Sequence, residues 1–400
     1  MNVLALNCGS SSVKLRLLET VPGASPAAAT ARAGGSVERL GPHARWTFEH
    51  AGTTDRGEGR VEDHTAAIER ALGWLGATGV AIDAVGHRVV HGGARFTAPA
   101  LVDDAVLAAI EALETLAPLH NRPSLAGIRA CRAALPAVPM VAVFDTAFHA
   151  SLPPPAAHYA IAHELAERHG IRRFGFHGLS YAWATIRAAA LLGRPVERLR
   201  LVVLHLGNGA SAAAIRDGAS LDTSMGFTPL EGLVMGTRSG DLDPALVGYL
   251  ARVERVGVDE VEAWLNERSG LAGLSGGPAD VRDLLAREGG DARARLALEV
   301  FCHRARKYLG AYLAVLEGAD AIVFTGGIGT YAPELRRRIA DGFAWCGLTL
   351  DEARNAATRE DGIISAEGSA IRALVIVADE ERIIAHETAA CVTGRAGSWR

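Results

Sequence analysis

One pattern occurs twice in this chain and constrains its fold more than any other feature: a short apolar strand, a turn of small polar residues and a returning strand. In the first copy, apolar residues 3–6 precede the turn Asn7-Cys-Gly-Ser-Ser-Ser12, and residues 13–18 alternate as a strand does. In the second copy, residues 201–206 precede Gly207-Asn-Gly-Ala-Ser211, and a strand returns through Ile215. Because strand and helix patterns alternate elsewhere, the sequence predicts an α/β protein with two similar domains.

A second pair of segments supports this duplication. Residues 321–329 form an apolar run that enters a glycine-rich loop, and they match residues 84–93 in their position after the strand–turn–strand pattern. Two similar domains of this kind are expected to face each other, with each domain contributing one phosphate-binding turn to a shared cleft.

The remaining elements are predicted from the periodicity of apolar residues and from the glycine and proline residues that interrupt helices and strands. Residues 19–62 are rich in Gly, Thr and Arg and fit short antiparallel strands, and three consecutive prolines at 153–155 are a plausible domain boundary. We therefore expect domains over residues 1–150 and 151–382, with a helix over 383–400 returning to the first. The other expected elements are helices at 63–77, 104–116 and 122–134 and strands at 84–90 and 138–144.

The first turn has the composition of a phosphate-binding site. Small residues let successive backbone N–H groups approach an anion closely. Lys14 adds a compact positive charge, and it is notable because only Lys14 and Lys307 are lysines among 41 basic residues. The alternative is an ordinary Gly/Ser hairpin with a solvated lysine.

Composition excludes several classes of function. The 400 residues are 49% hydrophobic and 22% charged, and their net charge of −4 without a basic run does not indicate a nucleic-acid partner. The sequence has neither a transmembrane-length apolar stretch nor a signal peptide, so a cytoplasmic protein is expected. Five widely spaced cysteines without a CxxC pair indicate reduced thiols and no metal cluster. Cys8, inside the first turn, is expected to pack as a small residue.

Polar clusters are expected at strand ends, where α/β proteins usually build their sites. Arg88 and Arg238 lie in glycine-flanked segments and suit a planar anion held from two sides. A single histidine in such a loop is more often structural, but three of them, His120, His177 and His205, favour a site.

Asp145 follows the apolar run Val141-Ala-Val-Phe144 and would emerge at the carboxyl end of a strand. That is a position from which a carboxylate supports a magnesium ion. The alternative for Asp145 is a helix cap or a turn residue.

Seven stretches together resemble the acetate kinase family, within the superfamily of sugar kinases, Hsp70 and actin. They are NCGSSSVK, GHRVVHGG, APLHN, VFDTAFH, GFHG, HLGNGAS and the long segment DTSMGFTPLEG…GTRSGDLDP, and they occur in the order of the family between Met1 and about Thr388. The resemblance implies duplicated ribonuclease H-like (βββαβαβα) domains and reversible transfer of the γ-phosphoryl group of ATP to acetate, which gives acetyl phosphate and ADP. It also implies a bound Mg²⁺, with Mn²⁺ as an alternative ion, and a homodimer.

Catalytic roles are carried over from the family residue by residue. The resemblance implies that Arg88 and Arg238 hold the carboxylate and the transferred phosphoryl group, and that His177 stabilises the transition state. Asp145 would support the metal and an arginine. Asn7 and Glu380 match positions linked to the metal, and the choice between Glu380 and Glu381 stays open.

Binding roles are implied in the same way. A small apolar pocket for the methyl group of acetate would include Val90, Leu119, Phe176 and Pro229, which would otherwise be interpreted as core residues. Nucleotide and phosphate contacts would come from Ser12, Lys14, His205, Leu206, Gly207, Asn208, Gly209, Asp280, Val281, Arg282, Gly326, Gly327, Ile328, Gly329 and Tyr331.

The chain departs from the family in three stretches near the site. Thr330 and Tyr331 replace a Glu-Asn pair in the adenosine loop, Ala378-Asp-Glu-Glu381 replaces Thr-Asn-Glu-Glu, and Gly178-Leu-Ser-Tyr181 replaces Gly-Thr-Ser-His. We therefore expect an acetate kinase, with a propionate or butyrate kinase as the alternative within the fold. A non-kinase ATP-driven switch is disfavoured, because few residues follow the last motif.

Overall fold

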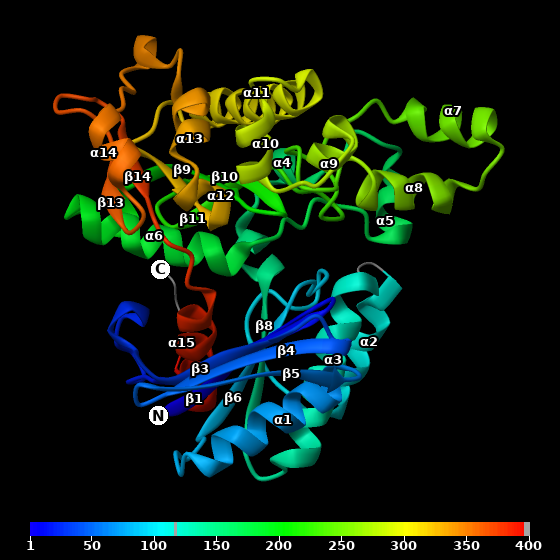
Figure 1. Ribbon diagram of the computed structural model, residues 1–400, viewed down its shortest axis with the longest axis vertical. Helices are drawn as coiled ribbons and strands as arrows, with labels where there is room; N and C mark the ends of the chain where they lie inside the picture. Colours follow the sequence, from blue (N-terminus) through cyan, green and yellow to red (C-terminus); the bar gives the residue numbers. More distant parts are fainter. Residues whose placement is uncertain (116–117, 396–400) are drawn as a thin grey trace. The chain divides into compact units, whose positions relative to one another are not determined.

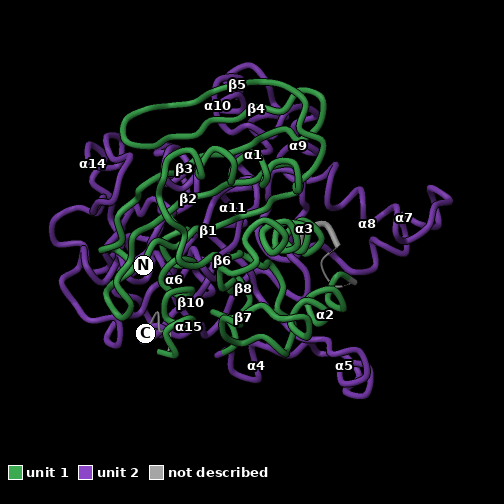
Figure 2. The backbone as a smooth tube through the Cα atoms, turned by 90° about the horizontal axis from the view of Figure 1, so that it is seen from below, with its two compact units in different colours: residues 1–150, 379–399 green, residues 151–378, 400 purple. Residues whose placement is uncertain are grey.

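The computed structural model describes residues 1–115 and 118–395, without the side chains of residues 115–120. The chain divides into two compact units, which are coloured separately in Figure 2. Unit 1 comprises Met1–Ala150 and Asp379–Trp399, and unit 2 comprises Ser151–Ala378. Unit 1 is therefore built from two segments that are far apart in the sequence.

Unit 1 contains a mixed sheet of eight strands in the order β5-β4-β3-β2-β1-β6-β8-β7 (Figure 1). The strands β1 to β5 pair antiparallel, as predicted for residues 19–62, although β3, β4 and β5 have nine or ten residues each and are not short. The strands β1, β6 and β8 run parallel. Their bounds are β1 Asn2–Gly9, β2 Ser12–Glu19, β3 Thr30–Glu38, β4 Gly41–His50, β5 Thr53–Val61, β6 Ala84–Val89, β7 Ala100–Leu101 and β8 Met140–Phe144.

Helices α1 (His64–Ala77) and α3 (Pro118–Ala134) pack on one face of this sheet, and α2 (Asp104–Ala112) packs on α3. Asp63 begins α1 by accepting a hydrogen bond from the backbone N–H of Ala66, as an N-cap residue does. Alternate residues of β1, Leu4, Leu6 and Cys8, join the core beneath α1. Cys8 is buried there, and burial raises the pKa of its thiol to about 12, which confirms that it packs as a small residue.

Helix α15 (Glu380–Val392) covers the other face of the same sheet, against β1, β6 and β8. The close approach requires Gly86 in β6, because a Cβ atom there would lie 2.2 Å from Thr388 Oγ1 and 2.6 Å from Ile384 Cγ2. The helix predicted over 383–400 thus begins three residues earlier, directly after Asp379.

Unit 2 contains a sheet of six strands in the order β11-β10-β9-β12-β14-β13. Its antiparallel pair β9–β10 and the parallel pair β9–β12 repeat the relation of β1–β2 and β1–β6 in unit 1. This repetition is the duplication expected from the sequence. The bounds are β9 Arg200–Leu206, β10 Ala210–Arg216, β11 Ala219–Thr223, β12 Ala321–Thr325, β13 Gly362–Ile363 and β14 Arg372–Val375.

The helices described in unit 2 are more numerous than those described in unit 1. They are α4 Pro154–Ala157, α5 His163–His169, α6 Gly178–Leu192, α7 Ala245–Glu254, α8 Val258–Glu267, α9 Gly270–Ser275, α10 Val281–Arg287, α11 Ala292–Val315, α12 Gly326–Tyr331, α13 Pro333–Ala340 and α14 Glu352–Ala357. Short 3₁₀ helices occupy Pro26–Ala28, Leu113–Thr115, Asp145–Ser151, Val196–Arg198 and Ala344–Cys346.

Two expectations about polar loops are wrong. The glycine segment at 326–331 is the helix α12 and not a loop, because Gly326 adopts a positive φ of 75° that turns the chain directly from β12 into a helix. The segment APLHN does not follow a strand; its residues from Pro118 onward begin α3, which starts four residues before the predicted 122.

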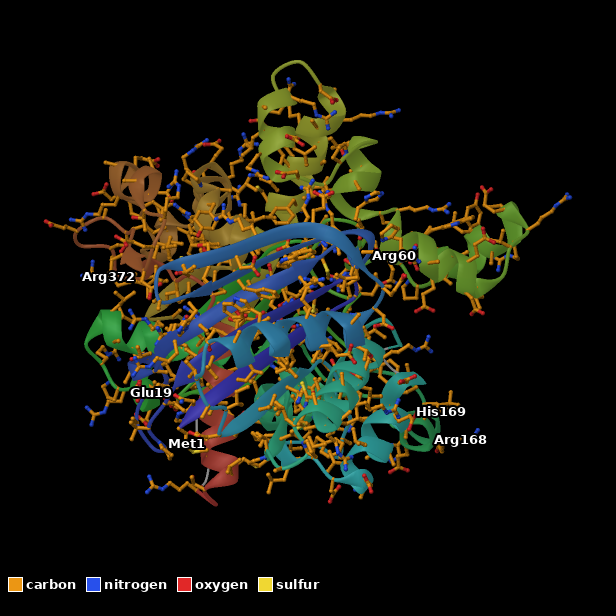
Figure 3. All side chains as sticks on the ribbon, turned by 60° about the horizontal axis from the view of Figure 1, so that its bottom comes forward. Met1, Glu19, Arg60, Arg168, His169 and Arg372 are labelled. Atoms are coloured by element: carbon orange, nitrogen blue, oxygen red, sulfur yellow. The ribbon has the colours of Figure 1, made fainter. Side chains whose placement is uncertain are left out.

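Charged side chains such as Glu19 and Arg60 extend into solvent (Figure 3). Arg168 and His169 project from the last turn of α5, where positive charge complements the helix dipole. None of the helices described is both long enough and apolar enough to cross a lipid bilayer.

Candidate active site

The first phosphate turn is a tight hairpin between β1 and β2, with Ser10 and Ser11 at its tip. Gly9 pairs with Ser12, and Asn7 pairs with Lys14, so the side chains of Asn7 and Lys14 belong to neighbouring strands. Lys14 is exposed and lines a cavity of about 320 Å³ together with Glu381. This geometry is compatible with a phosphate-binding turn and also with an ordinary Gly/Ser hairpin. Only the charged residues beside the turn favour the phosphate-binding site.

Those charges converge on Arg88, in β6. Its Nε and Nη2 atoms donate to the two carboxylate oxygens of Asp145 at 3.0 and 2.5 Å, and its Nη1 donates to Asn7 Oδ1 at 3.1 Å. Glu380 Oε2 lies 3.6 Å from Arg88 Nε. Asp145 directly follows β8 and is fully buried, as the strand-end argument predicted. The structure therefore brings together the predicted metal-linked residues Asn7, Asp145 and Glu380 around one arginine.

The cluster carries more negative than positive charge. Burial, and then repulsion from Asp145 and Glu381, raises the pKa of Glu380 to about 7, although the nearby cation of Arg88 opposes the shift. Burial alone would lower the pKa of Arg88, but Asp145 and Glu380 outweigh it and raise that pKa. No group of three His, Cys, Asp or Glu side chains suited to a metal ion occurs in the part of the chain that the structure describes.

The second phosphate turn lies between β9 and β10 and is bordered by two rings and a guanidinium group. The imidazoles of His177 and His205 stack with centroids 4.2 Å apart. Gly209 allows the approach, because a Cβ atom there would lie 2.9 Å from Arg238 Nη2 and 3.4 Å from His177 Nε2. Backbone, imidazole and guanidinium donors thus surround one turn, as an oxyanion site requires.

Arg238 has no counter-charge among the described residues. Its Nη1 donates to the carbonyl oxygen of Pro229 at 2.6 Å, and within the described residues it makes no ion pair with a carboxylate. Burial lowers the pKa of this guanidinium group, because a half-buried cation without a carboxylate partner is poorly solvated. An anion bound at this turn would remove that cost.

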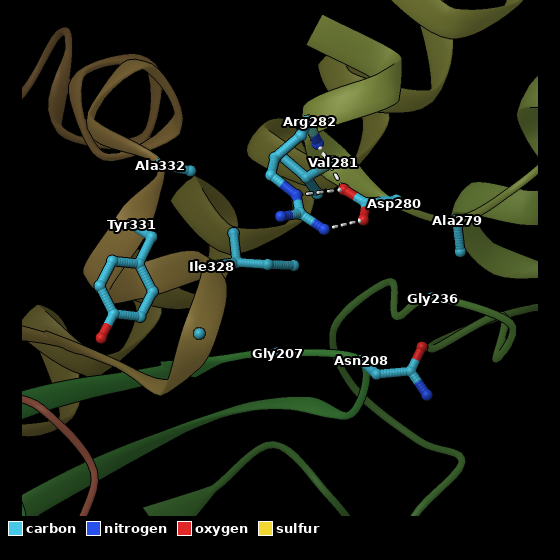
Figure 4. Close-up of a pocket in the computed structure, with 11 residues that line it drawn as sticks. Gly207, Asn208, Gly236, Ala279, Asp280, Val281, Arg282, Ile328, Tyr331 and Ala332 are labelled. Atoms are coloured by element: carbon cyan, nitrogen blue, oxygen red, sulfur yellow. Dashed lines mark hydrogen bonds and ion pairs between the residues drawn. The ribbon is translucent and has the colours of Figure 1, made fainter. Parts of the chain in front are cut away.

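A pocket of about 540 Å³ in unit 2 is lined by eight of the fifteen residues predicted for nucleotide and phosphate contacts (Figure 4). Its size suits a purine nucleoside. The ring of Tyr331 stands at one side of the pocket, and the paired side chains of Asp280 and Arg282 stand at another. Arg282 donates from Nε and Nη2 to Asp280 at 3.1 and 2.6 Å. The lining residues are Gly207, Asn208, Gly236, Ala279, Asp280, Val281, Arg282, Gly327, Ile328, Tyr331 and Ala332.

Gly326 joins this pocket to the second phosphate turn. A Cβ atom at Gly326 would lie 2.6 Å from the carbonyl oxygen of Leu206, so only glycine lets α12 start against the end of β9. Arg336 fixes the other end of α12, since its Nη1 donates to the carbonyl oxygens of Gly329 and Thr330 at 2.9 and 2.6 Å. The predicted residues Leu206, Gly326 and Gly329 are thus backbone contacts that shape the pocket.

The four residues predicted for the methyl pocket are divided between the two units of the chain. Val90 directly follows β6 in unit 1 and is buried. Phe176 and Pro229 belong to unit 2, where Phe176 is buried beside His177 and Pro229 anchors Arg238. Leu119 and His120 have side chains outside the described residues.

Comparison with known proteins identifies the family. The acetokinase family model matches residues 2–386. The chain belongs to the acetokinase family. Acetate kinases of Desulfitobacterium hafniense and Leifsonia xyli subsp. xyli are 48% and 49% identical to it, and the alignments cover 97% and 96% of this chain and 98% and 97% of the relatives.

Solved structures of the acetokinase family confirm the α/β fold. The Porphyromonas gingivalis acetate kinase superposes with a TM-score of 0.89 at 38% identity, covering 98% of this chain and 99% of that one. A propionate kinase from Francisella tularensis subsp. tularensis SCHU S4 also reaches 0.89 at 38% identity, covering 97% and 98%. The family and the fold class predicted from the motifs are therefore confirmed.

Several residues of this acetokinase-family site were missed by the sequence. Ser211 contacts the ring of His177, Tyr181 contacts Ser211, and Arg336 supports the helix α12 that borders the pocket. A motif search could have included Ser211, which ends HLGNGAS. Arg336 had no detectable pattern, because its partners, apart from Asn355 Oδ1, are main-chain oxygens.

Proposed function

We propose that this chain is an acetate kinase that transfers the γ-phosphoryl group of ATP directly to the carboxylate of acetate, giving acetyl phosphate and ADP. The observation that carries the proposal is Arg238, a half-buried cation without a carboxylate partner among the described residues, beside His177 and the Gly209 turn. Such a cation suits a transferred phosphoryl group. Membership of the acetokinase family and the acetate kinases among its relatives support acetate as the acceptor.

The proposed reaction does not need a general base. Acetate is ionised at neutral pH, so its carboxylate oxygen can attack phosphorus without losing a proton. The P–O bond to ADP breaks as the new P–O bond forms, and ADP leaves with its charge balanced by nearby cations. The protein must align the reactants and neutralise charge. We assign Arg88 to the carboxylate, Arg238 to the phosphoryl oxygens, and His177 to a hydrogen bond that strengthens in the transition state.

The residues around Arg88 fit a magnesium ion bound with the nucleotide. Asp145, Glu380 and Asn7 offer hard oxygen ligands. Burial, and then repulsion from Asp145 and Glu381, raises the pKa of Glu380, and a divalent cation beside this carboxylate would relieve both effects. Mg²⁺ usually takes one or two carboxylates and completes its shell with water and phosphates, so a set of three acidic ligands is not required. When bound, the ion would neutralise phosphate charge, and Mn²⁺ would substitute.

Propionate is the second candidate acceptor, favoured by the structural likeness to the Francisella propionate kinase. One added methylene changes binding in an apolar pocket by only about 1–3 kcal/mol. The test is a hydroxylamine trap, which converts acyl phosphates to hydroxamates. Acetate, propionate and butyrate would be compared at equal concentrations with ATP and Mg²⁺. Highest kcat/KM with acetate supports the proposal, and absence of hydroxamate from all three acids would refute it.

We also propose that the protein acts as a cytoplasmic homodimer. Helices α7 and α8 expose Leu246, Tyr249, Val253 and Val258, which is an unusual amount of apolar surface for two adjacent helices. Sedimentation velocity at micromolar concentration should show a species of twice the 41.9 kDa chain mass. Replacement of Tyr249 and Val253 by glutamate should shift it to a monomer.

A further inference from the structure

The imidazole of His177 is backed by a short chain of buried hydroxyl groups. Its Nδ1 lies 2.8 Å from Ser211 Oγ, and Ser211 Oγ lies 2.5 Å from the phenolic oxygen of Tyr181. Tyr181 and Ser211 are both fully buried. Because Nδ1 contacts Ser211, the ring presents Nε2 to the Gly209 turn, 3.4 Å from where a Cβ atom of residue 209 would lie.

The local backbone explains why these groups meet. His177 adopts a left-handed conformation, with φ of 57°, immediately before α6. That conformation is costly for a residue with a side chain and needs support from its surroundings. Tyr181 lies one helical turn later and donates its backbone N–H to the carbonyl oxygen of His177 at 3.0 Å. Ser211 comes from β10, so the three residues connect the start of α6 to the sheet.

Tyr181 contributes a phenol to this chain of buried hydroxyl groups. Burial raises the pKa of this phenol above its ordinary value, so it keeps its proton across the physiological range. A histidine could change its protonation state there and alter the hydrogen bonds behind His177. Because the phenol keeps its proton, Ser211 has the same hydrogen-bond partner across the physiological pH range.

We propose that Tyr181 is a positioning residue for phosphoryl transfer, which acts through Ser211 to hold His177 in one ring orientation and one tautomer with Nε2 directed at the phosphate turn. The inference rests on the proposed function for its chemistry. Its physical basis is that a displacement of about 1 Å in a catalytic group can reduce the rate about 100-fold. Without the phenol, the hydroxyl of Ser211 loses the partner that fixes its direction.

We call the hydrogen-bonded chain from Tyr181 through Ser211 to His177 the relay. Kinetics of three variants test it: Tyr181→Phe, Ser211→Ala and the double variant. Each single change should lower kcat at least about tenfold with little change in the KM for acetate or ATP. The double variant should resemble the more impaired single variant, because both changes break one chain. The matched control is Thr185→Val, which removes another buried hydroxyl from α6, one that donates to the carbonyl oxygen of Tyr181 at 2.8 Å. It should keep kcat within about twofold.

Two further measurements separate positioning from a general structural effect. In a His177→Asn background, Tyr181→Phe should cause no additional loss of kcat, since its effect passes through His177. Nitrogen NMR of ¹⁵N-histidine-labelled protein, with His177→Asn used for assignment, should show one neutral tautomer of His177. Tyr181→Phe should give shifts averaged between the two tautomers.

The outcomes distinguish this inference from the proposed function. Wild-type kcat in Tyr181→Phe, additive losses in the double variant, or an unchanged tautomer spectrum would overturn the relay. Absence of acyl phosphate with the wild-type protein would instead refute the kinase, and the tautomer spectrum, which needs no turnover, would still test the relay.

Discussion

At the scale of single residues, the two arginines of the candidate site differ in their partners. Arg88 is surrounded by Asp145, Glu380 and Asn7, whereas Arg238 contacts only a carbonyl oxygen among the partners described. Arg88 is therefore pre-oriented by its carboxylates, and Arg238 is available to an incoming anion.

Arg88→Ala and Arg238→Ala should each lower kcat by about 10³- to 10⁵-fold, as losses of arginine contacts do in other phosphoryl transfers. Each contact strengthens as charge spreads over the phosphoryl oxygens, so kcat should fall more than KM rises. Steady-state acyl phosphate formation measures this, with circular dichroism to confirm folding. Arg282→Ala, at the exposed edge of the nucleotide pocket, is the control and should mainly raise the KM for ATP. Near wild-type turnover in either central variant would refute the assignment.

Glu387 in α15 gives a prediction about pH. Burial raises the pKa of this carboxyl from its usual 4.5 to about 7, and its Oε1 atom has no hydrogen-bond partner among the residues that the structure describes. The folded state therefore binds this proton more tightly than the unfolded state. The contribution of Glu387 to the free energy of unfolding is fully present below pH 4.5 and is lost as pH rises through 7. A shift of this size corresponds to about 3 kcal/mol.

Glu387→Gln should remove this loss, because the amide carries no ionisable proton. The difference in free energy of unfolding between the variant and the wild type should grow from near zero at pH 4.5 to about 3 kcal/mol in favour of the variant at pH 8. Urea titrations across this range measure it. Glu367→Gln changes the net charge equally at an exposed position and serves as the control. A constant difference across the range would contradict the assignment to Glu387.

At the scale of elements, α12 borders the pocket that we propose for the nucleotide. Gly326 brings this short helix against the end of β9, and Arg336 binds its last carbonyl oxygens. Tyr331, at its end, is 60% exposed and borders the pocket, where the family motif has an asparagine. An aromatic face stacks on any base, whereas an amide can read hydrogen bonds on a purine edge.

We therefore expect ATP to be a competent donor, GTP and ITP to follow closely, and pyrophosphate to work poorly, because base binding helps to align the γ-phosphate. The measurement is kcat/KM for ATP, GTP, ITP, CTP and pyrophosphate at saturating acetate and Mg²⁺. Tyr331→Asn should increase the preference for ATP over GTP. A preference for ATP of 100-fold or more in the wild type, or efficient use of pyrophosphate, would show that this account of α12 is wrong.

The contrast between α12 and the strands shows what the sequence can predict. Apolar runs such as 201–206 and 321–325 were located because burial on both faces of a sheet leaves a continuous pattern. The helix at Gly326–Tyr331 was not, since three glycines in six residues have poor helix propensity and only tertiary contacts hold them.

Site residues divide in the same way. Arg88, Asp145 and His177 were found because they lie in family motifs, and Asp145 was also found because it ends a strand. Ser211 was not connected with His177, since its distance from that ring depends on how β10 meets α6, and a motif does not encode that contact.

At the scale of the whole molecule, unit 1 depends on a helix from the far end of the chain. Residues Ile383, Ile384, Ala385, Ala389 and Ala390 of α15 are buried, and the helix packs on three strands of the unit 1 sheet. Its removal would uncover one face of a sheet whose other face is already covered by α1 and α3.

Ile384→Ala should destabilise unit 1 by about 2–5 kcal/mol, because it leaves a cavity against Gly86 in a site that is fully buried. Hydrogen exchange followed by mass spectrometry should show faster exchange in β1, β6 and β8, with β9, β10 and β12 unchanged. Ile339→Ala, fully buried in unit 2, is the reciprocal control. Equal acceleration in both sheets would mean that the two units unfold together.

The two-segment construction of unit 1 also sets an order of events during synthesis. Residues 1–150 leave the ribosome early, but α15 follows only after all of unit 2 has been translated. At roughly 5–20 residues per second, this delay is on the order of 10–50 s. During that interval the apolar strands β1, β6 and β8 lack the cover of α15, so the nascent chain exposes a surface that chaperones recognise. The segment that completes unit 1 is made after unit 2, so only a polypeptide that already includes all of unit 2 can close this hydrophobic face.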